Sequence, residues 1–107
     1  MRALIRHTIK PEHLDVHLEL LHAAHTELQT LQPADFEWTI YRVGDTGTFI
    51  EYTAGPHLPQ PLPTLPAFRR YRADLEQRRE GPGEFLELHR IASYDSRHTD
   101  PEEADGG

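Results

Sequence analysis

The chain has 107 residues, enough for one domain with one modest hydrophobic core. It contains no cysteine, which excludes disulfides, thiolate metal sites and a cysteine nucleophile. Its formal net charge of −7, with Lys10 as the single lysine, argues against nucleic-acid binding.

The first part of the chain predicts a strand, a helix and a second strand. Apolar and polar residues alternate over 3–9, as in a strand with one buried face. Pro11 suits the first turn of a helix, and leucines at steps of three and four make that helix amphipathic. Pro33 ends it at Gln32, and alternation over 36–43 predicts the second strand.

The middle of the chain predicts a hairpin followed by an irregular segment. Gly44-Asp45-Thr46-Gly47 is a turn sequence, and residues 48–53 are rich in β-branched and aromatic residues, which predicts a third strand. Residues 54–63 contain four prolines, so we expect a stiff, extended connection that joins no sheet.

The last part predicts a second helix, a fourth strand and a tail. Thr64 can cap a helix that carries apolar residues at core spacing up to Leu75, and Gly81-Pro82-Gly83 ends it. Residues 84–94 read as a strand. The acidic residues 95–107 predict a flexible tail, which leaves residues 1–94 as the domain.

This order of elements is the signature of a ferredoxin-like β-α-β-β-α-β sandwich, an α+β fold. We expect an antiparallel four-stranded sheet with both helices on one face, together with Ala3, Ile5, His7, Ile9, Phe36, Trp38 and Ile40. The opposite face would carry Leu4, Tyr41, Val43, Phe49, Leu86 and Leu88, mixed with Arg6, Glu51 and Arg90. Such an apolar face predicts a homodimer through the open sheet face, although antiparallel sheets also tolerate a semi-polar exposed face.

Two segments resemble the antibiotic biosynthesis monooxygenase (ABM) family. They are the hairpin Tyr41-Arg42 … Thr48-Phe49-Ile50-Glu51-Tyr52 and the helix start Leu65-Pro66-Ala67-Phe68-Arg69-Arg70-Tyr71. The resemblance extends over residues 1–94 and implies a dimeric α/β barrel with a small-molecule pocket between sheet and helices in each subunit. Some members of that family oxidise phenolic polyketide intermediates with O₂ and no cofactor, and others degrade haem.

The haem-degrading alternative fits the residues less well. Tyr52 stands where family members often have a tryptophan after the glutamate of the third strand. The proline-rich segment replaces a helical segment that often carries a histidine, and His57 does not align with it. We therefore expect no cofactor.

His25 and His7 are the candidate catalytic residues. On a helical wheel that starts at His13, His25 lies at about 120°, within the range that holds Leu14, Leu18, Leu21 and Leu28. His7 alternates with Ile5 and Ile9, so it points into the same layer from the sheet. Two neutral imidazoles facing one cavity could transfer protons near pH 7, although each could equally be a core histidine.

Four aromatic residues could hold a flat ligand or simply form core, and they are Trp38, Tyr52, Phe68 and Tyr71. Arg72 lies beside the apolar stripe of the second helix and could bind an anionic substrate, whereas the other arginines of that helix predict a solvated face. His89 shares its parity with Phe85 and Ile91, and it could face either the pocket or the dimer interface.

Two pairs of helical histidines have metal-ligand spacing, namely His13 with His17 and His22 with His25. Their wheel angles argue against one shared site and no carboxylate motif accompanies them, so surface histidines are the better interpretation and we expect no metal.

The residues thus leave two hypotheses open. The first is a cofactor-independent monooxygenase acting on a small aromatic or polyketide-like molecule, and the second is a non-catalytic ligand-binding or scaffold homodimer. With no membrane-spanning stretch and no signal peptide, because Arg6 and His7 interrupt the first apolar run, we expect a cytoplasmic protein without membrane partners.

Overall fold

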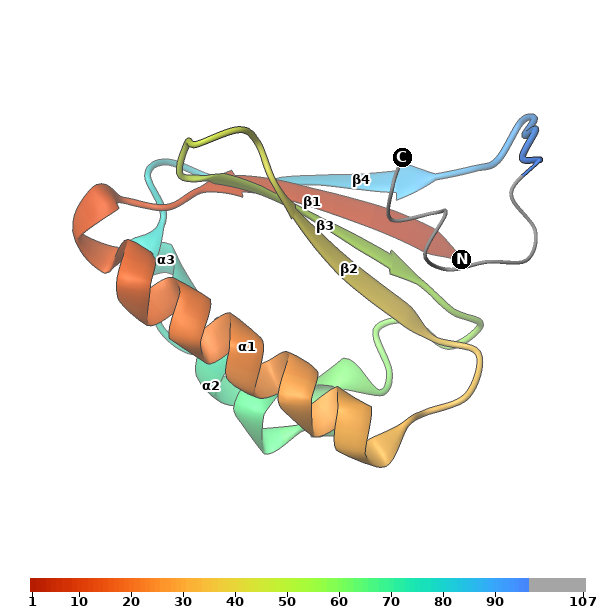
Figure 1. The fold of residues 1–107 in the computed structure, drawn as a ribbon, viewed down its shortest axis with the longest axis horizontal. Helices are drawn as coiled ribbons and strands as arrows, with labels where there is room; N and C mark the ends of the chain where they lie inside the picture. The colour runs from red at the N-terminus through yellow and green to blue at the C-terminus, as the bar shows by residue number, and fades with distance from the viewer. Residues whose placement is uncertain (97–107) are drawn as a thin grey trace.

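The computed structural model describes residues 1–96, which form one antiparallel sheet covered on one side by helices (Figure 1). The strands are β1 (Arg2–Thr8), β2 (Glu37–Arg42), β3 (Thr48–Ala54) and β4 (Glu84–Leu88). Their order in the sheet is β2-β3-β1-β4, and every neighbouring pair is antiparallel. This arrangement confirms the predicted ferredoxin-like α+β fold.

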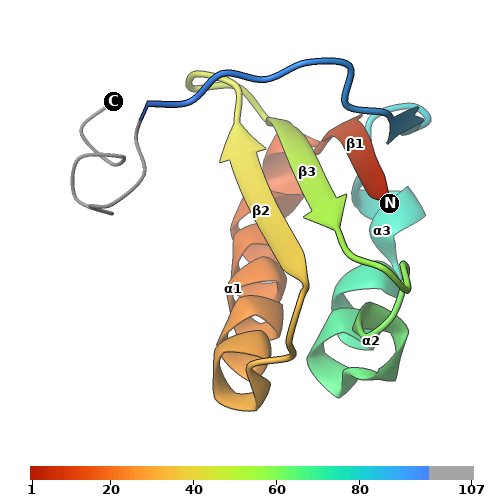
Figure 2. The ribbon, with the colours of Figure 1, turned by 90° about the vertical axis from the view of Figure 1, so that its right-hand side faces the viewer.

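The helices lie together on one face of the sheet, where α1 and α2 run side by side (Figures 1 and 2). The first helical segment comprises the 3₁₀ turn η1 (Pro11–His13) and helix α1 (Leu14–Leu31). The second comprises η2 (Leu62–Thr64), α2 (Pro66–Arg72) and α3 (Leu75–Arg78). No helix among the described residues is long and apolar enough to cross a membrane.

The second helical segment and the proline-rich segment before it differ from the prediction. Thr64 ends the 3₁₀ turn and donates to the Pro61 carbonyl at 2.6 Å, so it does not cap a helix. The segment over 54–63 folds back through turns instead of running extended, and this brings Leu62 into the core.

The fourth strand ends at Leu88, six residues earlier than predicted. In the register of the sheet, Leu88 pairs with Arg2, the first residue of β1, so later residues have no strand beside them. Residues 89–96 run on without regular structure, and most of the predicted tail over 95–107 lies outside the described residues.

The register of β3 corrects which side chains face the helices. Phe49 pairs with His7 and Glu51 pairs with Ile5, and paired residues project from the same face of a sheet. Both side chains therefore lie under the helices, where each is 2% exposed, and the prediction that they lie on the open face was wrong. Leu4 pairs with Leu86, so the open face carries these two leucines as predicted.

Two clusters of buried residues form the core. The larger contains Leu21, Ala24, Trp38, Leu62, Leu65, Ala67 and Tyr71, and the smaller contains Ile9, Phe49 and Leu75. Phe36 and Ile40 are half-buried against the larger cluster. Burial of a large apolar side chain contributes roughly 1.5–3 kcal/mol, so these clusters hold the helices on the sheet.

Candidate functional site

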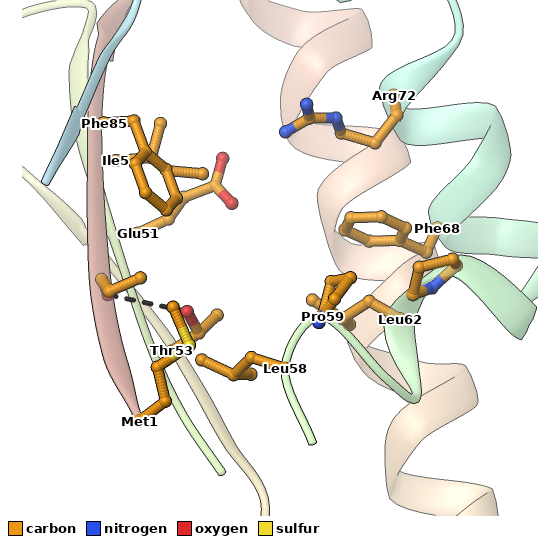
Figure 3. A pocket seen from close by; sticks show the side chains of 12 residues that line it. Met1, Ile5, Glu51, Thr53, Leu58, Pro59, Leu62, Phe68, Arg72 and Phe85 are labelled. Carbon is orange, nitrogen blue, oxygen red and sulfur yellow. Dashed lines mark hydrogen bonds between the residues drawn. The ribbon is translucent and has the colours of Figure 1, made fainter. Parts of the chain in front are cut away.

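A cavity of about 510 Å³ separates the sheet from α2 and the proline-rich segment (Figure 3). The sheet contributes residues from β1, β3 and β4, and the other wall comes from the proline-rich segment, η2 and α2. The lining residues are Met1, Ala3, Ile5, Glu51, Thr53, Leu58, Pro59, Leu62, Pro63, Phe68, Arg72 and Phe85. Most of these are apolar, and the charged side chains are Glu51, on the sheet, and Arg72, on α2.

Glu51 is a buried carboxylate held by two donors. Its Oε1 accepts a hydrogen bond from Trp38 Nε1 at 3.1 Å, and its Oε2 accepts one from the Tyr71 hydroxyl. Burial, followed by the neighbouring Glu51 charge, raises the pKa of Tyr71. Tyr71 therefore remains a neutral donor at physiological pH and helps to fix the carboxylate at the cavity wall.

His7 lies beside this carboxylate. Its Nε2 is 3.4 Å from Glu51 Oε2, but the contact lacks the alignment of a hydrogen bond, and neither ring nitrogen has a hydrogen-bond partner in the described part of the chain. Burial lowers the pKa of His7, with Glu51 opposing this effect and Arg79, Arg72 and Arg78 adding to it. The ring is therefore a neutral imidazole at pH 7.

His17 and Arg78 form a second buried polar pair next to His7. Arg78 Nε donates to His17 Nδ1 at 3.3 Å, and Arg78 Nη2 donates to the Tyr71 carbonyl. The His7 and His17 rings meet edge to face, 5.6 Å between centroids. Burial, then Arg78 and His7, lowers the pKa of His17 to about 4.

Two predictions about this pair were wrong. His17 is 0% exposed and Arg78 is 4% exposed, whereas both were expected at the surface. The sequence did contain a signal for His17: at about 40° on the helical wheel it lies between Ala24, which is buried, and Leu28, which is half-buried, and so nearer the centre of the buried stripe than His25. Arg78 carries no comparable signal, because an arginine among charged residues normally predicts a solvated face.

His25 lies away from the cavity. Its ring stacks on Trp38, with centroids 4.2 Å apart and planes 9° apart. Its Nδ1 lies 3.2 Å from the Leu21 carbonyl oxygen and its Nε2 lies 3.1 Å from that of Trp38. His25 and His7 therefore do not face a common cavity, and neither ring lines the cavity beside Glu51.

The predicted ligand-binding residues divide between the cavity, the core and the surface. Phe68 and Arg72 line the cavity. Trp38 and Tyr71 are core residues that hold Glu51 from behind.

Tyr52 and His89 lie elsewhere. Tyr52 projects from the open face of the sheet and accepts a hydrogen bond from Arg2 Nε at 2.9 Å. His89 follows β4, its side chain is 76% exposed, and its Nε2 lies 3.4 Å from a Glu87 carboxylate oxygen. Phe85 pairs with Ile5, so β4 turns Phe85 toward the cavity.

The described residues contain no cluster of three or more histidine, aspartate or glutamate side chains able to hold a metal ion. Sequence reasoning missed Glu51 as a cavity residue. Glu51 is two residues from Phe49 in the same strand, so the two side chains share a face, and a phenylalanine is typical of a core position. Had Phe49 been placed in the core, Glu51 would have followed it there.

No family model and no curated protein matches the sequence, but solved structures match the fold. One is a crystal structure of an antibiotic biosynthesis monooxygenase, with 17% identity, a TM-score of 0.66, and coverage of 85% of this chain and 98% of that one. A second, a Nitrosomonas europaea protein provisionally assigned the same family name, has 12% identity, a TM-score of 0.67 and coverage of 84% and 88%.

A third, from Mycobacterium tuberculosis, has 18% identity, a TM-score of 0.64 and coverage of 86% and 97%. Identities this low support the architecture and not the activity. The described chain therefore has the ferredoxin-like fold of the antibiotic biosynthesis monooxygenases, as the resemblance in its sequence implied.

Proposed function

We propose that this protein is an ABM-like monooxygenase that oxidises a small aromatic molecule with O₂ and no bound cofactor, and that Glu51 is its base. The observation that carries the proposal is one carboxylate in the wall of a largely apolar cavity of about 510 Å³. That volume suits a ligand of two or three fused rings, because small-molecule pockets usually measure roughly 300–1,000 Å³.

In this proposal Glu51 removes a proton from a phenolic or enolic substrate. The resulting anion gives electrons to O₂, and a ring carbon forms a C–O bond to give a hydroperoxide. Loss of water from the hydroperoxide leaves a carbonyl group, so one CH₂ and one O₂ become one C=O and one H₂O. His7, neutral and 3.4 Å behind Glu51, can share the proton that the carboxylate accepts.

Glu51 replaces His25 and His7 as the first candidate for the catalytic base. His25 lines no part of the cavity, and His7 reaches it only through Glu51. The second hypothesis, a protein that binds the same ligands without oxidising them, shares the cavity and differs only in turnover.

Oxygen consumption with an anthrone and with 2-naphthol tests the proposal. Wild-type protein should consume O₂ faster than the spontaneous reaction, and Glu51→Gln should lose roughly 100-fold or more of that rate, as expected for loss of a general base. Glu87→Gln, which removes an exposed carboxylate of β4, is the matched control and should keep the rate.

Ligand binding measured alongside the rate separates the two hypotheses. Saturable binding with no O₂ uptake above background would support the non-catalytic protein instead. Full activity in Glu51→Gln would remove Glu51 from the mechanism.

We also propose that the protein is a homodimer through the open face of its sheet. Support comes from apolar side chains that this face presents to solvent, with Tyr41 59% exposed and Leu86 44% exposed. Sedimentation velocity at micromolar concentration should give twice the 12.3 kDa mass of one chain. Leu86→Glu should shift the protein toward monomer, and a wild-type monomer at this concentration would refute the dimer.

A further inference from the structure

We propose that the ligand of this cavity carries an anionic group, most simply a carboxylate, which Arg72 binds, while a hydroxyl of the same ligand donates to Glu51. This inference rests on the proposed function, and it narrows the substrate class to hydroxyaryl acids.

The placement of Arg72 is the first support. Its side chain extends from the last turn of α2 into the space opposite Glu51 and Phe85 (Figure 3). Within the described residues its guanidinium makes no hydrogen bond and no ion pair. By contrast, Arg69 of the same helix donates to the Pro63 carbonyl at 3.0 Å, and Arg6 pairs with Glu84 at 2.9 Å.

The state of Glu51 is the second support. Each of its two oxygens accepts one hydrogen bond, from Trp38 or from Tyr71, so each keeps a further acceptor position, and no ion pair joins Glu51 to Arg72. The guanidinium therefore faces the cavity with its donors free, and the carboxylate faces it as an acceptor. A ligand that matches both has an anionic acceptor at one end and a hydroxyl donor at the other.

The walls between these groups are apolar, and this indicates the body of the ligand. Ile5, Leu62, Phe68 and Phe85 lie around the space that the two charged residues face. An aromatic ring fits such walls, and a hydrogen bond between a guanidinium and an anion is roughly twice as strong as one between neutral groups. A guanidinium can also bind a carboxylate through two parallel hydrogen bonds.

A matched pair of probes tests the inference, namely 6-hydroxy-2-naphthoate and 2-naphthol, which differ in the carboxylate. Dissociation constants are measured at pH 7.5 by titration calorimetry with wild type, Arg72→Gln and Arg70→Gln. Arg70 is an exposed residue of the same helix outside the cavity, so Arg70→Gln changes the net charge equally.

Wild type and Arg70→Gln should bind the acid roughly tenfold or more tighter than 2-naphthol, in line with one charge-assisted interaction. Arg72→Gln should lose that preference while its affinity for 2-naphthol stays unchanged, and Arg72→Lys should recover part of it. Recovery by lysine is a readout that a purely structural role for Arg72 would not give.

The other outcomes are decisive as well. Equal affinities of wild type for the two probes would overturn the anionic substrate class and leave the cavity as a binding site. Equal weakening of both probes in Arg72→Gln would overturn Arg72 as the anion-binding residue. Failure of wild type to bind either probe would overturn both this inference and the proposed aromatic substrate.

Discussion

The buried imidazole of His17 should make the protein less stable in mild acid. His17 has a pKa of 6.5 in an unfolded chain and about 4 in the folded one, because burial and the neighbouring Arg78 disfavour its protonated form. As pH falls below 6.5, His17 binds a proton in the unfolded state but stays neutral in the folded state until the pH approaches 4. The contribution of His17 is therefore complete above about pH 6.5, is lost progressively toward pH 4, and falls no further below that.

The size of this effect follows from the two pKa values. Between pH 7 and pH 5, the proton bound by His17 in the unfolded chain lowers the free energy of unfolding by about 2 kcal/mol. Loss on this scale is a large fraction of the stability of a small domain. His7, whose pKa burial also lowers, acts in the same direction.

Urea unfolding at pH 7 and pH 5, at one fixed protein concentration, measures the effect. Fluorescence of Trp38, the single tryptophan, reports unfolding because its side chain is buried. His17→Asn keeps an acceptor for Arg78 Nε but cannot titrate, so its loss of stability between the two pH values should be smaller than that of wild type by about 2 kcal/mol.

His22→Asn is the matched control, because His22 is an exposed residue of α1. It should behave as wild type does at both pH values. Equal pH dependence in wild type and His17→Asn would refute the reasoning, since other groups would then account for the whole effect.

Two further substitutions test the polar network behind the cavity. Tyr71→Phe leaves a Glu51 oxygen without its buried donor and should lower the free energy of unfolding by about 1–3 kcal/mol in urea titrations, whereas Tyr41→Phe on the open face should change it little. Arg78→Met leaves the His17 Nδ1 and the Tyr71 carbonyl without their donor and should lower the free energy of unfolding by about 2 kcal/mol. Arg70→Met is the control and should change it very little. An unchanged urea midpoint in Arg78→Met would show that the guanidinium does not stabilise the fold.

The order and type of the elements were predictable from the sequence because they follow from local rules. Alternation with a period of two marks the strands, a proline starts the first helix, and Gly44-Asp45-Thr46-Gly47 marks the hairpin. The element order β-α-β-β-α-β is compatible with few sheet topologies, and the structure has the ferredoxin-like one.

The location of the site depended on contacts that no local rule supplies. Alternation shows that Phe49 and Glu51 share a face of their strand, but only pairing of β3 with β1 shows that this face meets the helices. Arg72 follows the apolar stripe of its helix in the sequence and lines the cavity in the structure, because the spacing of residues along a helix fixes their relative directions.

The sequence by itself thus determined the elements, their order and the residues that share each face. Only the tertiary structure decided which face of β3 is covered, that Glu51 and His17 are buried, and that His25 lies outside the cavity. The physical reason is that burial of a polar side chain depends on partners distant in the chain. Trp38 and Tyr71 hold Glu51 from 13 and 20 residues away, and Arg78 reaches His17 across 61.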